Sequence, residues 1–133
     1  MRFHDLTVGD QLPDLVVPLT RTRIVAGAIA SRDYQEIHHD ADLARERGSK
    51  DIIMNILTTN GFVGRFVTDW AGPNAFLRSV KIRLGAPNYP GETMTLTGEV
   101  RELRPDGQVA IVAVRGANGV GDHVNAIVEV ALP

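Results

Sequence analysis

The sequence predicts an α+β protein in which an antiparallel sheet wraps around one long apolar helix. Residues 52–70 are rich in apolar side chains at spacings of three and four, and these side chains cover most of the helix circumference, which indicates a buried helix. From residue 75 onward, apolar and polar residues alternate in segments separated by short turns, as in antiparallel strands. One helix covered by one sheet accounts for this order, so we expect a single domain over residues 1–133.

The composition is that of an ordinary globular domain. The 133 residues are 44% hydrophobic and 23% charged, with a formal net charge of −2. This balance argues against a nucleic-acid binder, which would carry a basic stripe. The absence of cysteine excludes disulfides, thiolate metal sites and a cysteine nucleophile, and it fits a cytoplasmic protein. No apolar run reaches the roughly 18 residues of a membrane span, so we expect no association with a membrane.

The N-terminal half contains an extended segment and two short helices. Residues 5–20 are expected to form an edge strand or an extended arm, because the two prolines of this segment cannot donate to a strand ladder. Short helices are expected over residues 23–32 and 41–47, each preceded by a side chain that can accept a hydrogen bond from the first turn. The capping residues available are Thr20 or Thr22 for the first helix and Asp40 for the second.

The long helix is expected over residues 52–70 and ends at Ala71-Gly72-Pro73-Asn74. Strands follow at residues 75–84, 92–103, 108–115 and 124–132. Short connections rich in Pro, Gly and Asn join these strands, so we expect an antiparallel meander. A sheet that covers a single helix leaves apolar surface and strand edges exposed, so we also expect a dimer or a larger assembly.

The residues most suited to catalysis are Asp33 and His38. In an unbroken helix, five steps of ~100° would place these two side chains roughly 140° apart, so they would not converge. They can face one pocket only if the helix ends near Asp33 and the chain turns through Tyr34-Gln35-Glu36. A histidine beside a carboxylate could then hold a water molecule and transfer protons. On spacing alone, the same residues also fit a surface turn with solvated charges.

Other polar residues near this pair have structural interpretations. His39 is expected at the rim of the site and Asp40 at a helix cap. A metal site is not supported, because adjacent histidines on a turn rarely face one ion and no second cluster supplies ligands. Asn55 could make a hydrogen bond between helix and sheet, or it could contact substrate near the free N–H groups of the helix N-terminus. For Asn60 we expect a packing role, and for His123 an exposed or hydrogen-bonded side chain.

The segment Ser31-Arg32-Asp33-Tyr34-Gln35-Glu36-Ile37-His38-His39-Asp40 resembles the signature of MaoC-like, (R)-specific enoyl-CoA hydratases. Further similarities are Lys50–Leu57, which leads into the long helix, and Tyr89-Pro90-Gly91-Glu92-Thr93 before a strand. The resemblance implies the hotdog fold, in which an antiparallel sheet wraps around a long helix. More specifically, segments 38–40, 48–52, 55–58 and 67–73 resemble the small catalytic subunit of a heteromeric hydratase of steroid side-chain degradation.

This resemblance implies roles for four residues. Asp33 and His38 would be the catalytic pair that activates water for addition to a 2-enoyl-CoA, and Asn55 with Ile56 would lie at the oxyanion and substrate-binding position. The wider family has a glycine where this chain has Asn55, which implies an altered substrate shape. Coenzyme A enters as part of the substrate, so no separate cofactor is implied. A bulky steroid side-chain acyl-CoA is the implied substrate, and the implied partner is a second MaoC-like subunit in a heterodimer or heterotetramer, or else a second copy in a homodimer.

Two other functions remain open from the sequence. A hotdog acyl-CoA thioesterase would hydrolyse the thioester and release free coenzyme A. A non-catalytic acyl-CoA-binding subunit would only shape the site of its partner. The intact spacing of Asp33 and His38 argues against the second alternative, since such a subunit has no need of both side chains.

Overall fold

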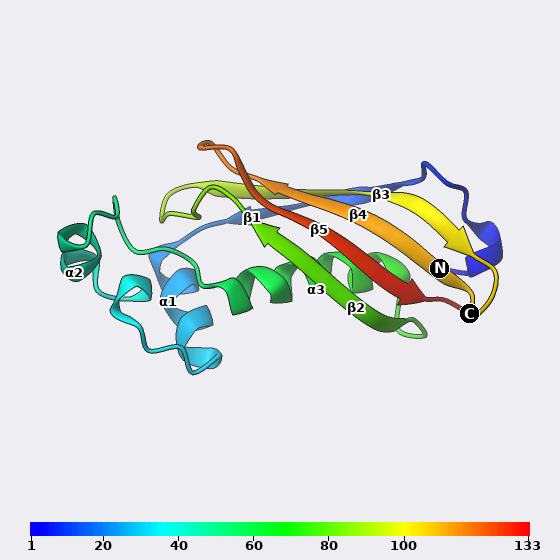
Figure 1. The fold of residues 1–133 in the computed structure, drawn as a ribbon, viewed down its shortest axis with the longest axis horizontal. Coiled ribbons are helices and arrows are strands. Elements are labelled where there is room, and N and C mark those ends of the chain that lie inside the picture. Colours follow the sequence, from blue (N-terminus) through cyan, green and yellow to red (C-terminus); the bar gives the residue numbers. More distant parts are fainter.

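The computed structural model describes all residues 1–133, and its framework is a five-stranded antiparallel sheet that curves around one helix (Figure 1). The strands are β1 (Gln11–Pro18), β2 (Phe76–Leu84), β3 (Thr93–Arg104), β4 (Val109–Ala117) and β5 (Asp122–Ala131). The helices are α1 (Arg21–Ala30), α2 (Ala41–Glu46) and α3 (Ile56–Ala71), with short 3-10 helices η1 (Phe3–Asp5) and η2 (Glu36–His38). No helix has both the length and the hydrophobicity needed to cross a membrane.

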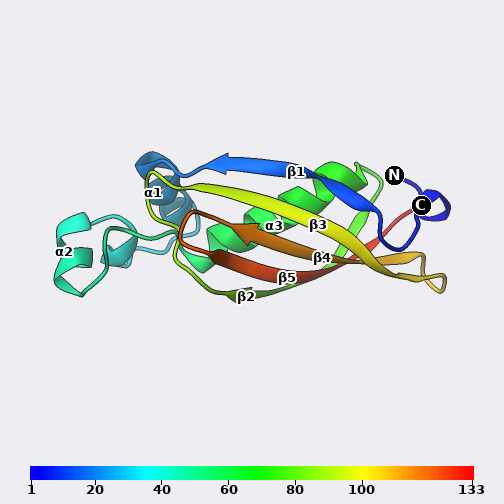
Figure 2. The same cartoon turned by 90° about the horizontal axis from the view of Figure 1, so that it is seen from above.

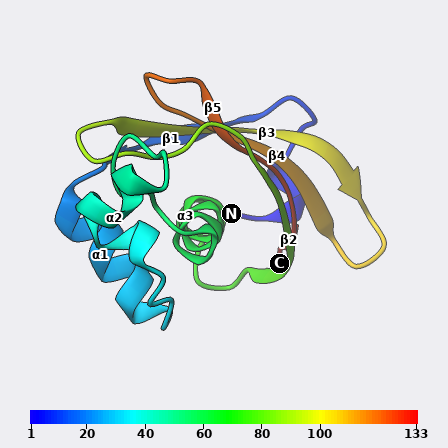
Figure 3. The same cartoon turned by 60° about the vertical axis from the view of Figure 1, so that its left-hand side comes forward.

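Helix α3 lies under the concave face of the sheet, and the sheet curls over it when the molecule is viewed from its left-hand side (Figure 3). Helices α1 and α2 lie together at the end of the molecule where α3 begins, and both termini lie at the opposite end (Figure 2). A backbone hydrogen bond of 2.9 Å from Phe3 N to Pro133 O joins the two terminal segments. The end of α1 and the start of α3, which residues 31–55 connect, lie at the end of the molecule opposite the termini.

The strand order is β1-β3-β4-β5-β2, which confirms β1 as an edge strand and corrects the predicted meander. Only β3, β4 and β5 follow one another as neighbours, whereas β2 pairs with β5 at the other edge. The connection between β2 and β3 is too long for a tight hairpin, because hairpin loops usually contain two to five residues. It continues along β5 through the bond from Gly85 N to His123 O (2.7 Å) and ends beside β1 through Gly91 N to Leu19 O (2.8 Å).

The first two helices follow their predicted caps, with small shifts in their bounds. Thr20 accepts a hydrogen bond from Arg23 N at 3.0 Å, so α1 begins at Arg21, two residues earlier than predicted. The helix also ends two residues earlier, at Ala30, because Arg32 adopts a φ of 56° and turns the chain. Asp40 accepts from Leu43 N at 3.1 Å, which confirms the predicted cap of α2.

Helix α3 begins at Ile56, so the predicted start at Ile52 is wrong by one turn. The preceding residues are extended because their N–H groups bond to other parts of the chain: Ile53 N to Ile37 O at 3.0 Å and Met54 N to Asn88 O at 3.1 Å. The predicted end is confirmed, since α3 stops at Ala71 before a glycine with positive φ.

The core lies between α3 and the concave face of the sheet. Val63, Phe66 and Val67 are buried there, and a Cβ at Gly98 of β3 would come within 2.7 Å of the Phe66 ring. This close approach explains why a residue without a side chain stands at that position. The expectation that α3 is buried around most of its circumference is wrong for this chain alone, because Ile56 and Leu57 are 51% and 52% exposed.

Candidate active site

Asp33 and His38 meet in the loop between α1 and α2. The chain break that the sequence requires occurs at Arg32, whose positive φ lets Asp33 N return to Ala28 O at 2.9 Å and close the helix end. His38 follows in the 3-10 helix η2. Asp33 Oδ2 then lies 3.3 Å from His38 Nε2, with side chains that are 23% and 10% exposed. Together the two residues present a carboxylate and an imidazole at a partly open position.

The tautomer of the neutral His38 ring follows from its second nitrogen. Nδ1 lies 2.7 Å from the carbonyl oxygen of Ile53. A carbonyl oxygen can only accept, so Nδ1 carries the proton and Nε2 of the neutral imidazole presents a lone pair to Asp33. Two acceptors therefore face each other across 3.3 Å, and a water molecule that donates a hydrogen bond to each would satisfy both.

Asp33 is held as a carboxylate. Asn55 Nδ2 donates to Asp33 Oδ2 at 3.1 Å, and Gln35 N donates to Asp33 Oδ1 at 3.4 Å. The hydrogen bond from Asn55, supported by the backbone N–H of Gln35, lowers the pKa of Asp33 below its ordinary value, and the opposing effect of partial burial is smaller than that of the Asn55 bond. The acid of the pair is therefore ionised at neutral pH.

Asn55 is buried and connects three elements of the site. Its Oδ1 accepts from Thr58 N at 3.0 Å, so it caps α3, and its Nδ2 donates to Ser31 Oγ at 2.9 Å as well as to Asp33. The hydrogen bond between helix and sheet, predicted as one alternative for Asn55, is therefore wrong, whereas the predicted substrate contact stays a prediction. Ser31 was missed by the sequence reasoning, although its place two residues before Asp33 in the motif could have indicated it.

The N-terminus of α3 presents backbone donors beside this network. The N–H groups of Asn55, Ile56 and Leu57 have no acceptor within the protein, whereas Thr58 N is bonded to the Asn55 side chain. Free N–H groups at a helix start carry a partial positive charge and suit a developing oxyanion. The structure thus brings the predicted oxyanion position next to Asp33.

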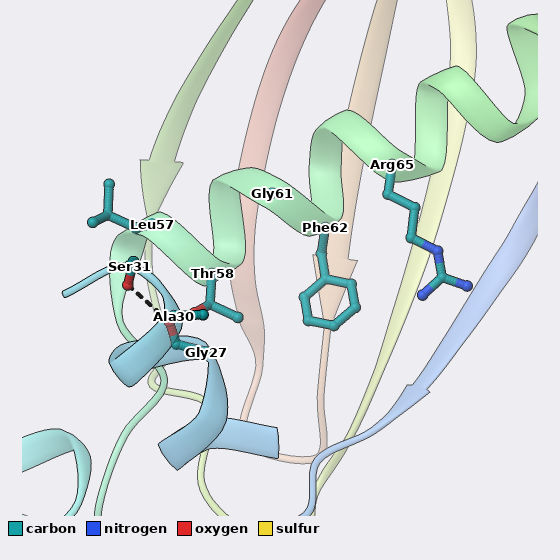
Figure 4. A pocket seen from close by; sticks show the side chains of 8 residues that line it. All are labelled: Gly27, Ala30, Ser31, Leu57, Thr58, Gly61, Phe62 and Arg65. Atoms are coloured by element: carbon teal, nitrogen blue, oxygen red, sulfur yellow. Dashed lines mark hydrogen bonds between the residues drawn. The ribbon is translucent and has the colours of Figure 1, made fainter. Parts of the chain in front are cut away.

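A groove of about 380 Å³ runs from this position along α1 and α3 (Figure 4). Its lining begins at Ser31, just after α1, and at Leu57 in the first turn of α3. It extends to Arg65, two turns further along α3. The helices touch where Gly27 packs against Thr58, yet a Cβ at Gly61 would meet nothing within 4 Å. The complete lining is Gly27, Ala30, Ser31, Leu57, Thr58, Gly61, Phe62 and Arg65.

The other predicted polar residues lie apart from the pair. His39 Nε2 faces Tyr34 O at 3.2 Å on the surface, and Asn60 is exposed, so its predicted packing role is wrong. His123 is buried between Thr59 Oγ1 at 2.8 Å and Ala86 O at 2.7 Å, which confirms that it is hydrogen-bonded. The structure contains no group of three or more His, Cys, Asp or Glu side chains placed to hold a metal ion.

Residues 7–121 match the family described as MaoC like domain, which covers most of the chain including the Asp33–His38 loop. The chain belongs to the MaoC-like domain family. It is 49% identical over 125 residues to the 3-oxo-4,17-pregnadiene-20-carboxyl-CoA hydratase beta subunit of Mycobacterium tuberculosis (strain ATCC 25618 / H37Rv), covering 94% of this chain and 95% of the relative.

Solved structures share the fold of this chain. The chain matches one in the crystal structure of the ChsH1-ChsH2 complex from Mycobacterium tuberculosis with a TM-score of 0.92 and 49% identity, covering 96% of this chain and 98% of that chain. The R-hydratase PhaJ1 from Pseudomonas aeruginosa shares the fold at a TM-score of 0.89 and 22% identity, over 99% and 85% of the two chains. The hotdog fold predicted from the sequence is confirmed.

Proposed function

We propose that this MaoC-like chain is the catalytic subunit of an enoyl-CoA hydratase, which adds water across the 2,3 double bond of a 2-enoyl-CoA. The observation that carries the proposal is the 3.3 Å approach of Asp33 Oδ2 to His38 Nε2, with His38 Nδ1 anchored on the Ile53 carbonyl. This anchoring leaves one lone pair and one carboxylate free to orient a single water molecule. The 49% identity to a chain named as a hydratase subunit supports the same reaction.

In the proposed reaction, one water molecule donates hydrogen bonds to Asp33 and His38 and directs its oxygen at Cβ of the enoyl thioester. The pair removes a proton as the O–Cβ bond forms, and the electrons of the double bond move onto the thioester oxygen. The enolate that results is stabilised by the free N–H groups at Asn55 and Ile56. Return of one proton from the pair to Cα completes the addition, and no cofactor is required.

For the substrate we propose a bulky steroid side-chain acyl-CoA. The relative with 49% identity is named for a pregnadiene carboxyl-CoA. The groove beside the start of α3 is lined by the small residues Ala30 and Gly61, and the open space at Gly61 suits a broad, apolar acyl group. A site of action in the cytoplasm fits a cysteine-free chain that acts on a coenzyme A thioester.

The proposed partner is a second MaoC-like subunit. The relative is named a beta subunit, and the similar structure is that of a two-component complex. Because Ile56 and Leu57 at the start of α3 are half exposed in the isolated chain, a partner that covers them would exclude water from the oxyanion position.

Substitution of the pair tests the proposed reaction. We expect Asp33→Asn and His38→Ala each to lower kcat for hydration of a steroidal 2-enoyl-CoA by about 100-fold or more, because each removes one half of the water-activating pair. The assay follows loss of the conjugated enoyl thioester, with and without the partner subunit. His39→Ala is the matched control, since His39 is exposed and bonds only to Tyr34 O.

Full activity in either variant would contradict the assigned pair. Release of free coenzyme A, detected with a thiol reagent, in place of hydration would identify a thioesterase. Hydration of short-chain enoyl-CoA by the chain alone would contradict the steroid substrate and the need for a partner.

A further inference from the structure

We propose that Asn55 is the positioning residue of the site: its carboxamide orients the Asp33 carboxylate toward His38 and sets the start of α3 at the same time. This inference rests on the proposed hydratase function and assigns a task to a buried polar residue of the site. The side chain is almost completely buried, with 1% of the residue exposed, and it contacts both halves of the candidate site.

The orientation of the carboxamide is determined by its neighbours. Thr58 approaches Oδ1 with two donors, its backbone N–H at 3.0 Å and its hydroxyl. Ser31 Oγ can donate its single proton to the carbonyl of Gly27 at 2.8 Å, so it is available to accept from Asn55 Nδ2 at 2.9 Å. A flipped amide would place an oxygen against the Asp33 carboxylate and lose the helix cap. The NH₂ group therefore points at Asp33.

The same carboxylate oxygen serves Asn55 and His38. Asp33 Oδ2 accepts from Asn55 Nδ2 at 3.1 Å and faces His38 Nε2 at 3.3 Å, while the second oxygen accepts from Gln35 N at 3.4 Å. With a donor on each oxygen, rotation of the carboxylate away from His38 would break a charge-assisted hydrogen bond. His38 is the titratable group in contact with Asp33, but its Nε2 presents a lone pair there, so removal of the Asn55 donor leaves only the Gln35 N–H to hold the carboxylate.

Asn55 also links water activation to enolate stabilisation. As the N-cap it sets where α3 begins, and the unpaired N–H groups of Ile56 and Leu57 follow directly. The carboxylate and these donors thus take their relative positions from one buried side chain. A glycine at this position would keep the backbone donors but could not reach Asp33.

The test uses two variants with the native partner subunit present. Asn55→Asp keeps the capping oxygen and replaces the donor by an acceptor, and Asn55→Ser keeps a capping hydroxyl that is too short to reach Asp33. We expect kcat for hydration to fall by about 10- to 100-fold in each, with KM changed much less, because a hydrogen bond to a charged group is lost. The exposed residue Asn60 provides the matched control Asn60→Asp on the same helix.

The pH profile separates positioning from a merely structural role. Asn55 is the main cause of the lowered pKa of Asp33, so its loss lets this pKa rise toward the ordinary value. The acidic limb of kcat/KM should therefore move to higher pH in both variants, and a carboxyl NMR titration should show the same shift of Asp33 without any turnover. A folded Asn55→Ser protein with kcat within twofold of wild type and an unmoved Asp33 titration would overturn the inference. If wild type does not hydrate enoyl-CoA at all, the proposed function fails, and the NMR titration still decides whether Asn55 holds Asp33.

Discussion

Asp33 and His38 cooperate because Arg32 changes the direction of the chain between them. Its φ of 56° ends α1 and lets the next three residues cross from the helix end to η2. The sequence indicated that a break was necessary, since a continuous helix would separate the two side chains. It did not indicate which residue would take the left-handed conformation, because an arginine has no special preference for it.

Asp51 is a second carboxylate whose surroundings determine its chemistry. It makes a two-pronged contact with Arg21, each N–O distance being 2.9 Å, and lies 3.6 Å from Arg45. The hydrogen bonds from Arg21 lower the pKa of Asp51 to about 2. The contact joins α1 and α2 to the extended segment before α3, close to the candidate active site.

We predict that Asp51→Asn lowers the free energy of unfolding at pH 7 by about 1–2 kcal/mol, which allows for solvent screening of the half-exposed Arg21. A lowered carboxyl pKa contributes stability above the ordinary value of 3.8, and this contribution is lost as the pH falls toward about 2. Urea unfolding at pH 7 and at pH 3 should therefore show a smaller difference between wild type and variant at the lower pH. Asp42→Asn, which removes the charge of a fully exposed side chain, should change the free energy of unfolding little at either pH.

At the scale of elements, the start of α3 depends on contacts made far away in the sequence. Apolar residues 52–54 continue the helical pattern, so the sequence alone favoured a helix that includes them. In the structure Ile52 and Met54 are buried in extended conformation, and the N–H groups of Ile53 and Met54 bond to the loops at Ile37 and Asn88. This extended entry places the carbonyl of Ile53 against His38 and puts Asn55 at the cap.

His123 of β5 connects the sheet to α3 through a hydrogen bond with Thr59. Its Nδ1 donates to Ala86 O, so its Nε2 accepts from the Thr59 hydroxyl and the buried ring is neutral. Burial lowers the pKa of His123 below the ordinary value of 6.5. As the pH falls below 6.5, the unfolded chain binds a proton at this residue before the folded protein does, so folding stability decreases.

We predict that wild type loses more stability between pH 7.5 and pH 5.5 than His123→Gln does, although His123→Gln is less stable at pH 7.5 because the Thr59 contact is altered. Thermal unfolding at the two pH values measures this difference. His4→Gln is the control, because His4 is exposed and its substitution should leave the pH dependence of wild type intact. Equal pH dependence in wild type and His123→Gln would rule out His123 as the source.

At the scale of the whole molecule, the two edges of the sheet differ. The β1 edge carries Pro13 and Pro18, which hinder pairing with another strand. The β2 edge has no proline, and Phe76 at its start is 69% exposed. Exposed apolar residues on β2 and at the start of α3 agree with the assembly expected from the sequence.

We predict that Phe76→Lys weakens association of the chain, whether with a second copy or with the proposed partner, by replacing an exposed aromatic ring with a charge. Folding stability should change by less than about 0.5 kcal/mol, because Phe76 is mostly exposed in the isolated chain. Light scattering over a concentration series, for the chain alone and mixed with the partner, measures the effect. If the oligomeric state is unchanged both for the chain alone and for the chain mixed with the partner, the subunit interface does not include Phe76.

On spacing alone the sequence left open both the cap of α1, Thr20 or Thr22, and the pairing of Asp33 with His38, but it determined the α+β class, the cap at Asp40 and the end of α3. These features depend on neighbours within a few residues, so hydrophobic spacing, caps and turn residues were sufficient. The tertiary structure alone decided that β2 lies beside β5, that α3 starts at Ile56, and that Asn55 reaches back to Ser31 and Asp33. Each of these depends on hydrogen bonds between residues at least 16 positions apart, which local sequence patterns do not encode.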